Sequence, residues 1–195
     1  MSAWEFPTSV IIGNADFEIR TDYRVVLDLL SALNNPELTD SNKEINAYMQ
    51  SRLILEIMYP DYQLIPQSNI QEAIDRVAEF IDMGLGDDSK KPKMMDWEQD
   101  AAIIIPSINK VLNKEIRAEK YIHWWTFLGA YMEIGEGLFS NIIHIRQKKL
   151  KGKKLEKWEQ EFYKENKHLI DFQQREKRSN EEKEMLRDYF GYSKK

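Results

Sequence analysis

The chain contains no cysteine, and this absence excludes several kinds of chemistry at once. Disulfide frameworks, thiolate nucleophiles and cysteine-based zinc sites are all ruled out. Histidine is scarce, and none of the three residues shows the spacing of a zinc protease. The phosphate-binding loop, the dinucleotide fingerprint and the nucleophile elbow are missing as well. We therefore expect no catalytic residues, no metal and no cofactor, in a protein that is not an enzyme.

Long hydrophobic runs are missing too. Apolar stretches such as 101–105 fall far short of the roughly 20 residues that a membrane span requires. Residues 1–7 carry neither the basic nor the apolar region of a signal peptide. Hydrophobic residues still make up 42% of the chain, enough for a core in 195 residues. We expect a soluble intracellular protein with no membrane partner.

The charge is unevenly distributed along the sequence. Before Arg146 there are 12 Lys and Arg against 23 Asp and Glu, a net charge of −11. From Arg146 onward there are 16 against 10, a net charge of +6. Such asymmetry predicts that the basic part contacts a partner or the acidic body. We expect residues 1–150 to form a hairpin plus helical core domain and residues 151–195 a basic, charged helical C-terminal extension.

The pattern of the first half predicts a short hairpin followed by helices. Residues 9–12 and 16–20 read as two strands that Gly13 and Asn14 join in a turn. The helices that follow have apolar residues at helical spacing and recognisable start signals. Those signals are Thr21, the capping box 41–44 and the capping box 68–71. The expected fold is mainly α, a helical bundle with a short N-terminal β-hairpin.

The second half predicts further helices with two interruptions. Asp96 and Gln99 open an apolar helix in which Pro106 causes a bend or a break. We expect the later helices over 118–134, from Phe139 after the glycines at 135 and 137, over 153–172, and after a last capping box at 179–182. A thin apolar stripe of Leu155, Trp158, Phe162 and Leu169 is expected on the 153–172 helix.

The densest aromatic point of the chain is the run 121–127, which contains two adjacent tryptophans. Neighbouring residues on a helix point about 100° apart, so one core-facing stripe does not bury Trp124 and Trp125 equally. One ring is expected in the core, and the other against the C-terminal helix or a protein partner. His123 is interpreted as a structural residue. We choose Tyr121, Trp124, Trp125 and Tyr131 as candidate partner contacts, with a core role as the alternative.

The run 146–154 is the best candidate for binding nucleic acid, because lysine clusters bind phosphates. The glutamates at 156, 159, 161 and 165 alternate with lysines, which favours a solvated helix with internal ion pairs. No RNA-binding aromatic signature or helix-turn-helix pattern accompanies the run. We therefore expect no nucleic-acid partner, and we add Lys148 and Lys149 to the candidate partner-binding residues.

The sequence resembles a small helical family encoded in the tail gene cluster of long-tailed phages and prophages. The resemblance depends mainly on 96–101 and on the HWW motif within 121–127. Weaker similarity extends to about Phe172 through the segments 7–10, 59–60, 80–84, 139–146 and 158–163. Pro106 and the charged segment after Phe172 depart from the family pattern.

Members of that family resemble tail assembly chaperones, which are encoded beside the tape-measure gene. The resemblance implies that this protein coats the tape-measure protein in the host bacterial cytoplasm, recruits tail-tube protein and is absent from the finished virion. Helix-in-groove docking on the aromatic cluster would cover the apolar stripes of a tape measure. Many copies along one rod imply self-association. Two alternatives stay open: a structural tail component of the virion, or a nucleic-acid-binding phage protein that uses 146–154.

Overall fold

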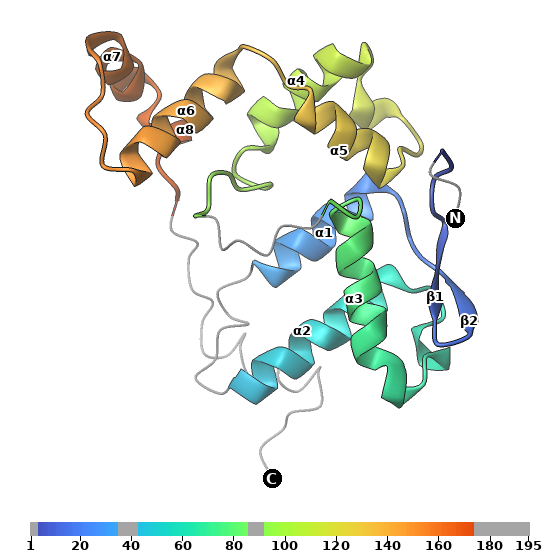
Figure 1. Cartoon of the computed structure of the whole chain (residues 1–195). Coiled ribbons are helices and arrows are strands. Elements are labelled where there is room, and N and C mark those ends of the chain that lie inside the picture. Colours follow the sequence, from blue (N-terminus) through green and yellow to red (C-terminus); the bar gives the residue numbers. More distant parts are fainter. Residues whose placement is uncertain (1–3, 35–42, 86–91, 174–195) are drawn as a thin grey trace.

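The computed structural model describes residues 4–34, 43–85 and 92–173, and within them the fold is mainly α, as predicted (Figure 1). Two strands, β1 (Ser9–Ile12) and β2 (Ala15–Glu18), form the predicted antiparallel hairpin. The α-helices are α1 (Tyr23–Leu33), α2 (Lys43–Met58), α3 (Ile70–Ile81), α4 (Ala101–Leu112), α5 (Trp124–Met132), α6 (Leu138–Leu150), α7 (Lys157–Glu165) and α8 (Lys167–Ile170). Short 3-10 helices are η2 (Tyr62–Leu64), η3 (Gln67–Asn69) and η4 (Ile116–Ala118).

The hairpin lies at one side of the molecule, beside α3, and α6, α7 and α8 lie at the other side (Figure 1). Between them α1 packs on α2 and α5, and α4 packs on α5 and α6. Side chains from nearly every element share one core, because each helix buries a single apolar stripe. The most deeply buried large side chains include Leu29, Met58, Tyr59, Ile104, Trp124, Phe127, Ile142 and Ile170.

Two predicted helix caps are wrong. Helix α1 is capped by Asp22 and not by Thr21, because the Asp22 carboxylate accepts the N–H of Arg24 at 2.9 Å. The Thr21 hydroxyl instead bonds the Tyr121 hydroxyl at 2.7 Å. The box at 68–71 does not cap α3, because η3 winds through it and the Ser68 hydroxyl bonds its neighbour. The boxes at 41–44 and 179–182 involve residues outside the described part of the chain.

Pro106 does not break its helix, since α4 runs continuously across it. The proline removes the donor for the carbonyl of Ala102, and both residues lie on the exposed face of α4. Water can therefore hydrate that carbonyl, and the buried face with Ile103, Ile104 and Ile108 keeps its packing.

The helix predicted over 118–134 begins later than expected, at Trp124. The preceding residues pair with the start of α1: the N–H of Tyr23 donates to the carbonyl of Ile122 at 3.0 Å, and the N–H of Trp124 donates to Thr21 at 2.7 Å. These long-range backbone hydrogen bonds compete with the local helical ones, and helix propensity is a weak preference that tertiary contacts override. The predicted interruption near Gly135 is confirmed.

The helix predicted over 153–172 is also wrong, because it is two short helices, α7 and α8. Trp158 is 49% exposed and does not belong to a buried stripe, whereas Leu155, Phe162 and Leu169 pack against the core. Helix α8 packs on α6, so these residues contact the rest of the molecule. The domain boundary at residue 150 stays a prediction.

Candidate functional site

The HWW motif begins with His123, which caps the N-terminus of α5. Its Nδ1 accepts the backbone N–H of Trp125 at 3.1 Å, and its Nε2 lies 3.0 Å from the carbonyl of Pro7. This pair of contacts requires a neutral ring with the proton on Nε2, which donates to Pro7. Burial lowers the pKa of His123 and outweighs the opposite effect of the Pro7 hydrogen bond. His123 is thus a structural residue that joins the N-terminal segment to α5.

The two tryptophans of the motif contact the end of α3. The indole N–H of Trp124 donates to the carbonyl of Ile81 at 2.8 Å, and that of Trp125 donates to Phe80 at 2.8 Å. The last carbonyls of a helix lack helical donors, so the indoles add a donor to each of these groups, although the Phe80 carbonyl also accepts the N–H of Met83 at 3.3 Å. The HWW motif therefore starts one helix and caps another.

The structure places the predicted partner contacts at different depths. Tyr121 is 53% exposed, Trp125 and Tyr131 are half-buried, and Trp124 is 1% exposed. Trp124 is a core residue, which corrects its choice as a surface contact, because its ring packs on Phe127 with centroids 5.6 Å apart. The partner-binding role of the other three aromatics stays a prediction.

An exposed aromatic segment that we did not predict lies next to the motif. Phe6 is 58% exposed and stacks on the His123 ring with centroids 4.4 Å apart. Trp4 is 97% exposed, and Tyr121 is exposed two residues before His123. We call Trp4, Phe6, Tyr121 and Trp125 the aromatic surface. The signal for it in the sequence was the presence of two aromatic residues, Trp4 and Phe6, within the first seven residues.

The lysines chosen as partner contacts are engaged within the molecule. Lys148 pairs with Glu159, and Lys149 pairs with Asp171 and lies over the ring of Tyr163. Burial raises the pKa of Glu159. Three hydrogen bonds outweigh burial and lower this pKa to about 2; they come from Lys148, from the backbone N–H of Glu156 and from His144. Neither ammonium is available to a phosphate unless it gives up its carboxylate.

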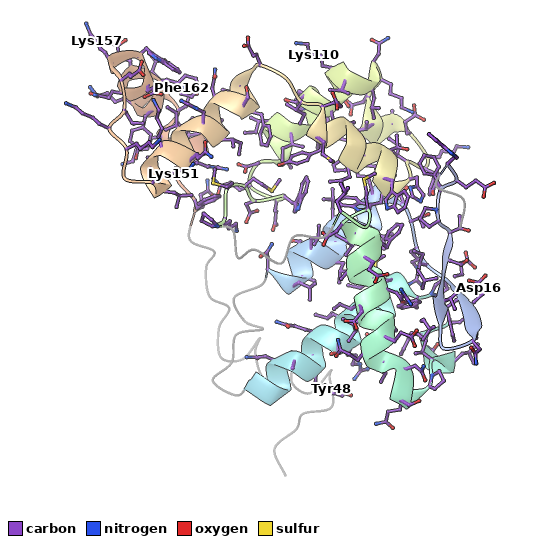
Figure 2. All side chains as sticks on the ribbon, viewed as in Figure 1. Asp16, Tyr48, Lys110, Lys151, Lys157 and Phe162 are labelled. Carbon is purple, nitrogen blue, oxygen red and sulfur yellow. The ribbon has the colours of Figure 1, made fainter. Side chains whose placement is uncertain are left out.

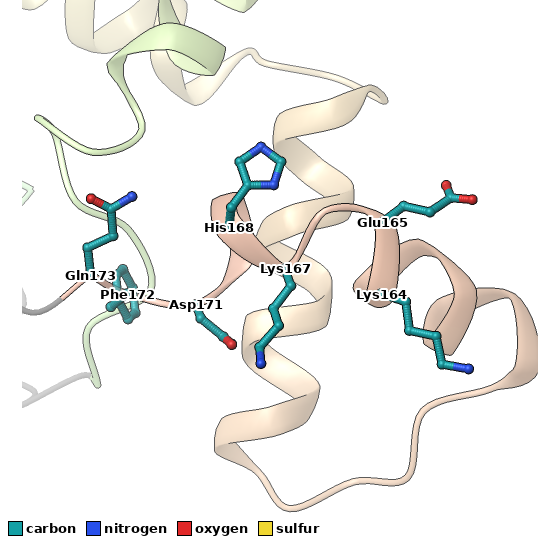
Figure 3. Close-up of a pocket in the computed structure, with 7 residues that line it drawn as sticks. All are labelled: Lys164, Glu165, Lys167, His168, Asp171, Phe172 and Gln173. Atoms are coloured by element: carbon teal, nitrogen blue, oxygen red, sulfur yellow. The ribbon is translucent and has the colours of Figure 1, made fainter.

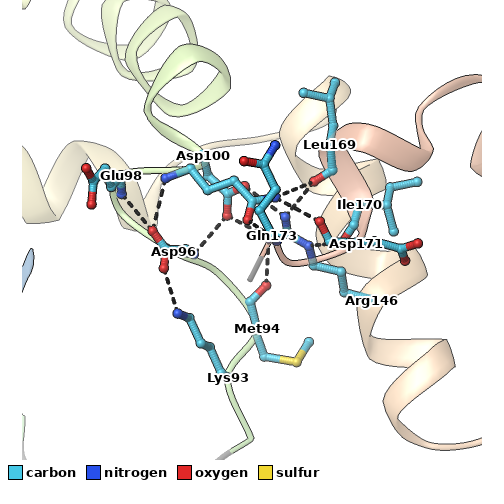
Figure 4. A network of polar contacts seen from close by, with 11 residues as sticks. Lys93, Met94, Asp96, Glu98, Asp100, Arg146, Leu169, Ile170, Asp171 and Gln173 are labelled. Atoms are coloured by element: carbon cyan, nitrogen blue, oxygen red, sulfur yellow. Dashed lines mark hydrogen bonds and ion pairs between the residues drawn. The ribbon is translucent and has the colours of Figure 1, made fainter. Parts of the chain in front are cut away.

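A buried ion pair joins α6 to the start of α4, and its arginine also contacts the end of α8 (Figure 4). The guanidinium of Arg146 donates to both oxygens of Asp100 at 2.6 and 2.8 Å, and both side chains are almost fully buried. It also donates to the carbonyls of Met94, Leu169 and Ile170. All these hydrogen bonds stay within the protein, so Arg146 and Asp100 hold the surrounding segments together and are not free to bind a ligand.

The residues around a hollow beside α7 and α8 do not converge (Figure 3). The side chains of Lys164, Glu165 and His168 point in different directions. The carboxylate of Asp171 accepts a hydrogen bond from the ammonium of Lys149. No group of three or more metal-ligating side chains is arranged to hold an ion within the described residues. No helix in that part of the chain is both long and apolar enough to span a membrane.

Comparison with known proteins gives one result. A family model described as Bacteriophage Gp15 protein matches residues 5–172, which include the hairpin and every described helix. No curated protein and no solved structure matches the chain. The match confirms the predicted relation to a bacteriophage family, and the chaperone role and the significance of the HWW motif stay predictions. The chain belongs to the Bacteriophage Gp15 protein family.

Proposed function

We propose that this protein is a non-enzymatic morphogenesis protein of a bacteriophage, a tail assembly chaperone that binds the tape-measure protein and helps recruit tail-tube subunits in the host cytoplasm. The observation that carries the proposal is the aromatic surface on a body whose own core is already complete. Phe6 and Tyr121 remain more than half exposed although neighbouring rings are buried. Exposed aromatic groups beside well-packed ones are typical of protein-binding surfaces.

The residues that underlie the aromatic surface are held by hydrogen bonds, and this order favours binding. His123 lies under Phe6 and is held by two hydrogen bonds, and Trp125 is fixed by its indole bond to α3. A surface that is ordered before binding loses less conformational entropy when a partner docks. An apolar helical stripe of a tape measure fits such a surface by helix-in-groove docking.

Co-expression with the tape-measure protein of the same phage tests the proposal. We expect the tape measure to become soluble and to co-purify with the native chain. The variant Trp4→Ser/Phe6→Ser should lose most of this co-purification while keeping its helical circular dichroism. Leu64→Ser is the matched control, because Leu64 is 71% exposed and lies outside the aromatic surface. A tape measure that stays insoluble with the native chain would refute the proposal.

The second candidate function is a structural component of the tail, since family membership is equally compatible with it. Mass spectrometry of purified virions separates the two functions, because an assembly chaperone is expected to be absent from the particle. The nucleic-acid alternative loses two of its lysines, since Lys148 and Lys149 are paired with carboxylates.

A further inference from the structure

Four exposed lysines occupy the loop between α6 and the start of α7. We call Lys151, Lys153, Lys154 and Lys157 the basic tip. None of them makes an ion pair with any described residue, in contrast to Lys148 and Lys149 before them. Gly152 ends α6 in a left-handed conformation with φ +62°, and the backbone N–H of Lys153 returns to the carbonyl of Lys148 at 2.9 Å. The turn is thus ordered, and the side chains of all four lysines are exposed.

The hairpin offers a surface of opposite charge. Ile11 lies directly across from Asp16 in the register, and Glu18 follows two residues later, so the three side chains share one face. All three are exposed, and Ile11 is 58% exposed. Neither carboxylate makes an ion pair with a described residue. We call Ile11, Asp16 and Glu18 the hairpin outer face. Its opposite face, with Val10 and Ile12, is buried.

The two surfaces lie at opposite ends of the molecule. Figure 2 shows Lys151 and Lys157 at one end and Asp16 at the other, so the two sets cannot pair within one chain. Each surface also offers an exposed apolar side chain: Trp158 follows Lys157 of the basic tip, and Ile11 belongs to the hairpin outer face. Like ends of two molecules repel, and unlike ends attract.

We propose that the basic tip of one copy docks on the hairpin outer face of a second copy, which gives a head-to-tail chain of this protein. A second copy fits each surface because the two surfaces are opposite in charge and lie too far apart to pair within one chain. A head-to-tail contact is heterologous, so a dimer still has one unoccupied basic tip and one unoccupied hairpin outer face. Further copies can add there, which gives a filament, or a ring if the ends meet. Exposed ion pairs are individually weak and are screened by salt, so the free protein associates weakly and reversibly.

Sedimentation velocity of the full chain over a range of concentrations, at low and at high salt, tests this contact. We expect concentration-dependent association at low salt that decreases at high salt. The variant Lys153→Glu/Lys154→Glu should need a concentration about tenfold higher for the same association, because attraction becomes repulsion. Asp16→Lys/Glu18→Lys should behave in the same way.

Variants in which the charges of both surfaces are reversed provide the decisive comparison. A chain that carries both pairs of substitutions should associate again, and the two single-surface variants should associate with each other when mixed. Lys110→Glu/Lys120→Glu is the matched control, because it makes the same change in net charge at exposed lysines outside both surfaces. Circular dichroism checks that every variant stays folded.

Three results of the sedimentation experiment would overturn the proposal. They are a native chain that stays monomeric at low salt, a control variant that loses association equally, and a doubly exchanged chain that does not recover it. A monomeric chain whose basic tip binds a labelled DNA duplex would also overturn it and assign the surface to nucleic acid. Because the contact does not involve the aromatic surface, a basic-tip variant that loses self-association but keeps tape-measure co-purification separates the two proposals.

Discussion

Replacement of Arg146 by methionine should destabilise this protein severely. The change removes two hydrogen bonds to Asp100 and three to backbone carbonyls, and it leaves a carboxylate with 1% exposure facing apolar surroundings. Asp100 keeps one donor, the backbone N–H of Asp96 at 2.9 Å. Removal of one partner from a buried pair costs about 3–5 kcal/mol. For a chain of this size the melting temperature should fall by roughly 6 to 20 °C.

Urea denaturation followed by circular dichroism measures the free energy of unfolding of Arg146→Met, Asp100→Asn and the double variant. We expect the double variant to lose clearly less than the sum of the single losses, because it contains no unpaired buried charge. Hydrogen exchange should show faster exchange in α8 in Arg146→Met, since Arg146 holds the carbonyls of Leu169 and Ile170.

An exposed arginine provides the control. Arg117 is paired with Glu115, but the side chain of Arg117 is 64% exposed, so Arg117→Met should cost less than about 1 kcal/mol. If Arg146→Met costs no more than Arg117→Met, the reasoning about the buried pair is wrong. Additive losses in the double variant would likewise show that Arg146 and Asp100 do not depend on each other.

Two further predictions concern the HWW motif. Because burial lowers the pKa of His123, the unfolded chain takes up its proton first, and stability should fall as the pH drops below about 6.5. His123→Asn keeps a capping side chain that does not titrate, so its urea midpoint should change less between pH 7.5 and pH 5, and equal slopes would contradict the assignment. Trp125→Phe removes the indole donor to the Phe80 carbonyl, which keeps only the N–H of Met83 at 3.3 Å, and it should cost about 1 kcal/mol of unfolding free energy; an unchanged free energy would contradict a role for this hydrogen bond.

The sequence alone determined the fold class and the main boundaries of the first half. Strand alternation and the turn at Gly13 fixed the hairpin, because these signals act between near neighbours. The apolar spacing of α1 and α3 likewise identified both helices. The resemblance in several segments predicted a bacteriophage family, and the comparison confirms that relation.

Tertiary contacts decided the parts where distant residues compete with local preference. The segment before Trp124 is not helical because it pairs with the start of α1, about 100 positions earlier in the chain. Trp124 is buried because its ring packs on Trp97 and Phe127, and the end of α3 accepts the indole N–H groups of both tryptophans; periodicity encodes neither contact. The pairing of Lys148 and Lys149, and the absence of ion-pair partners for the basic tip among the described residues, depend on where α7 and α8 fold back. Local spacing specifies which face of a helix is apolar, but only the packed chain specifies what that face, and each charge beside it, will contact.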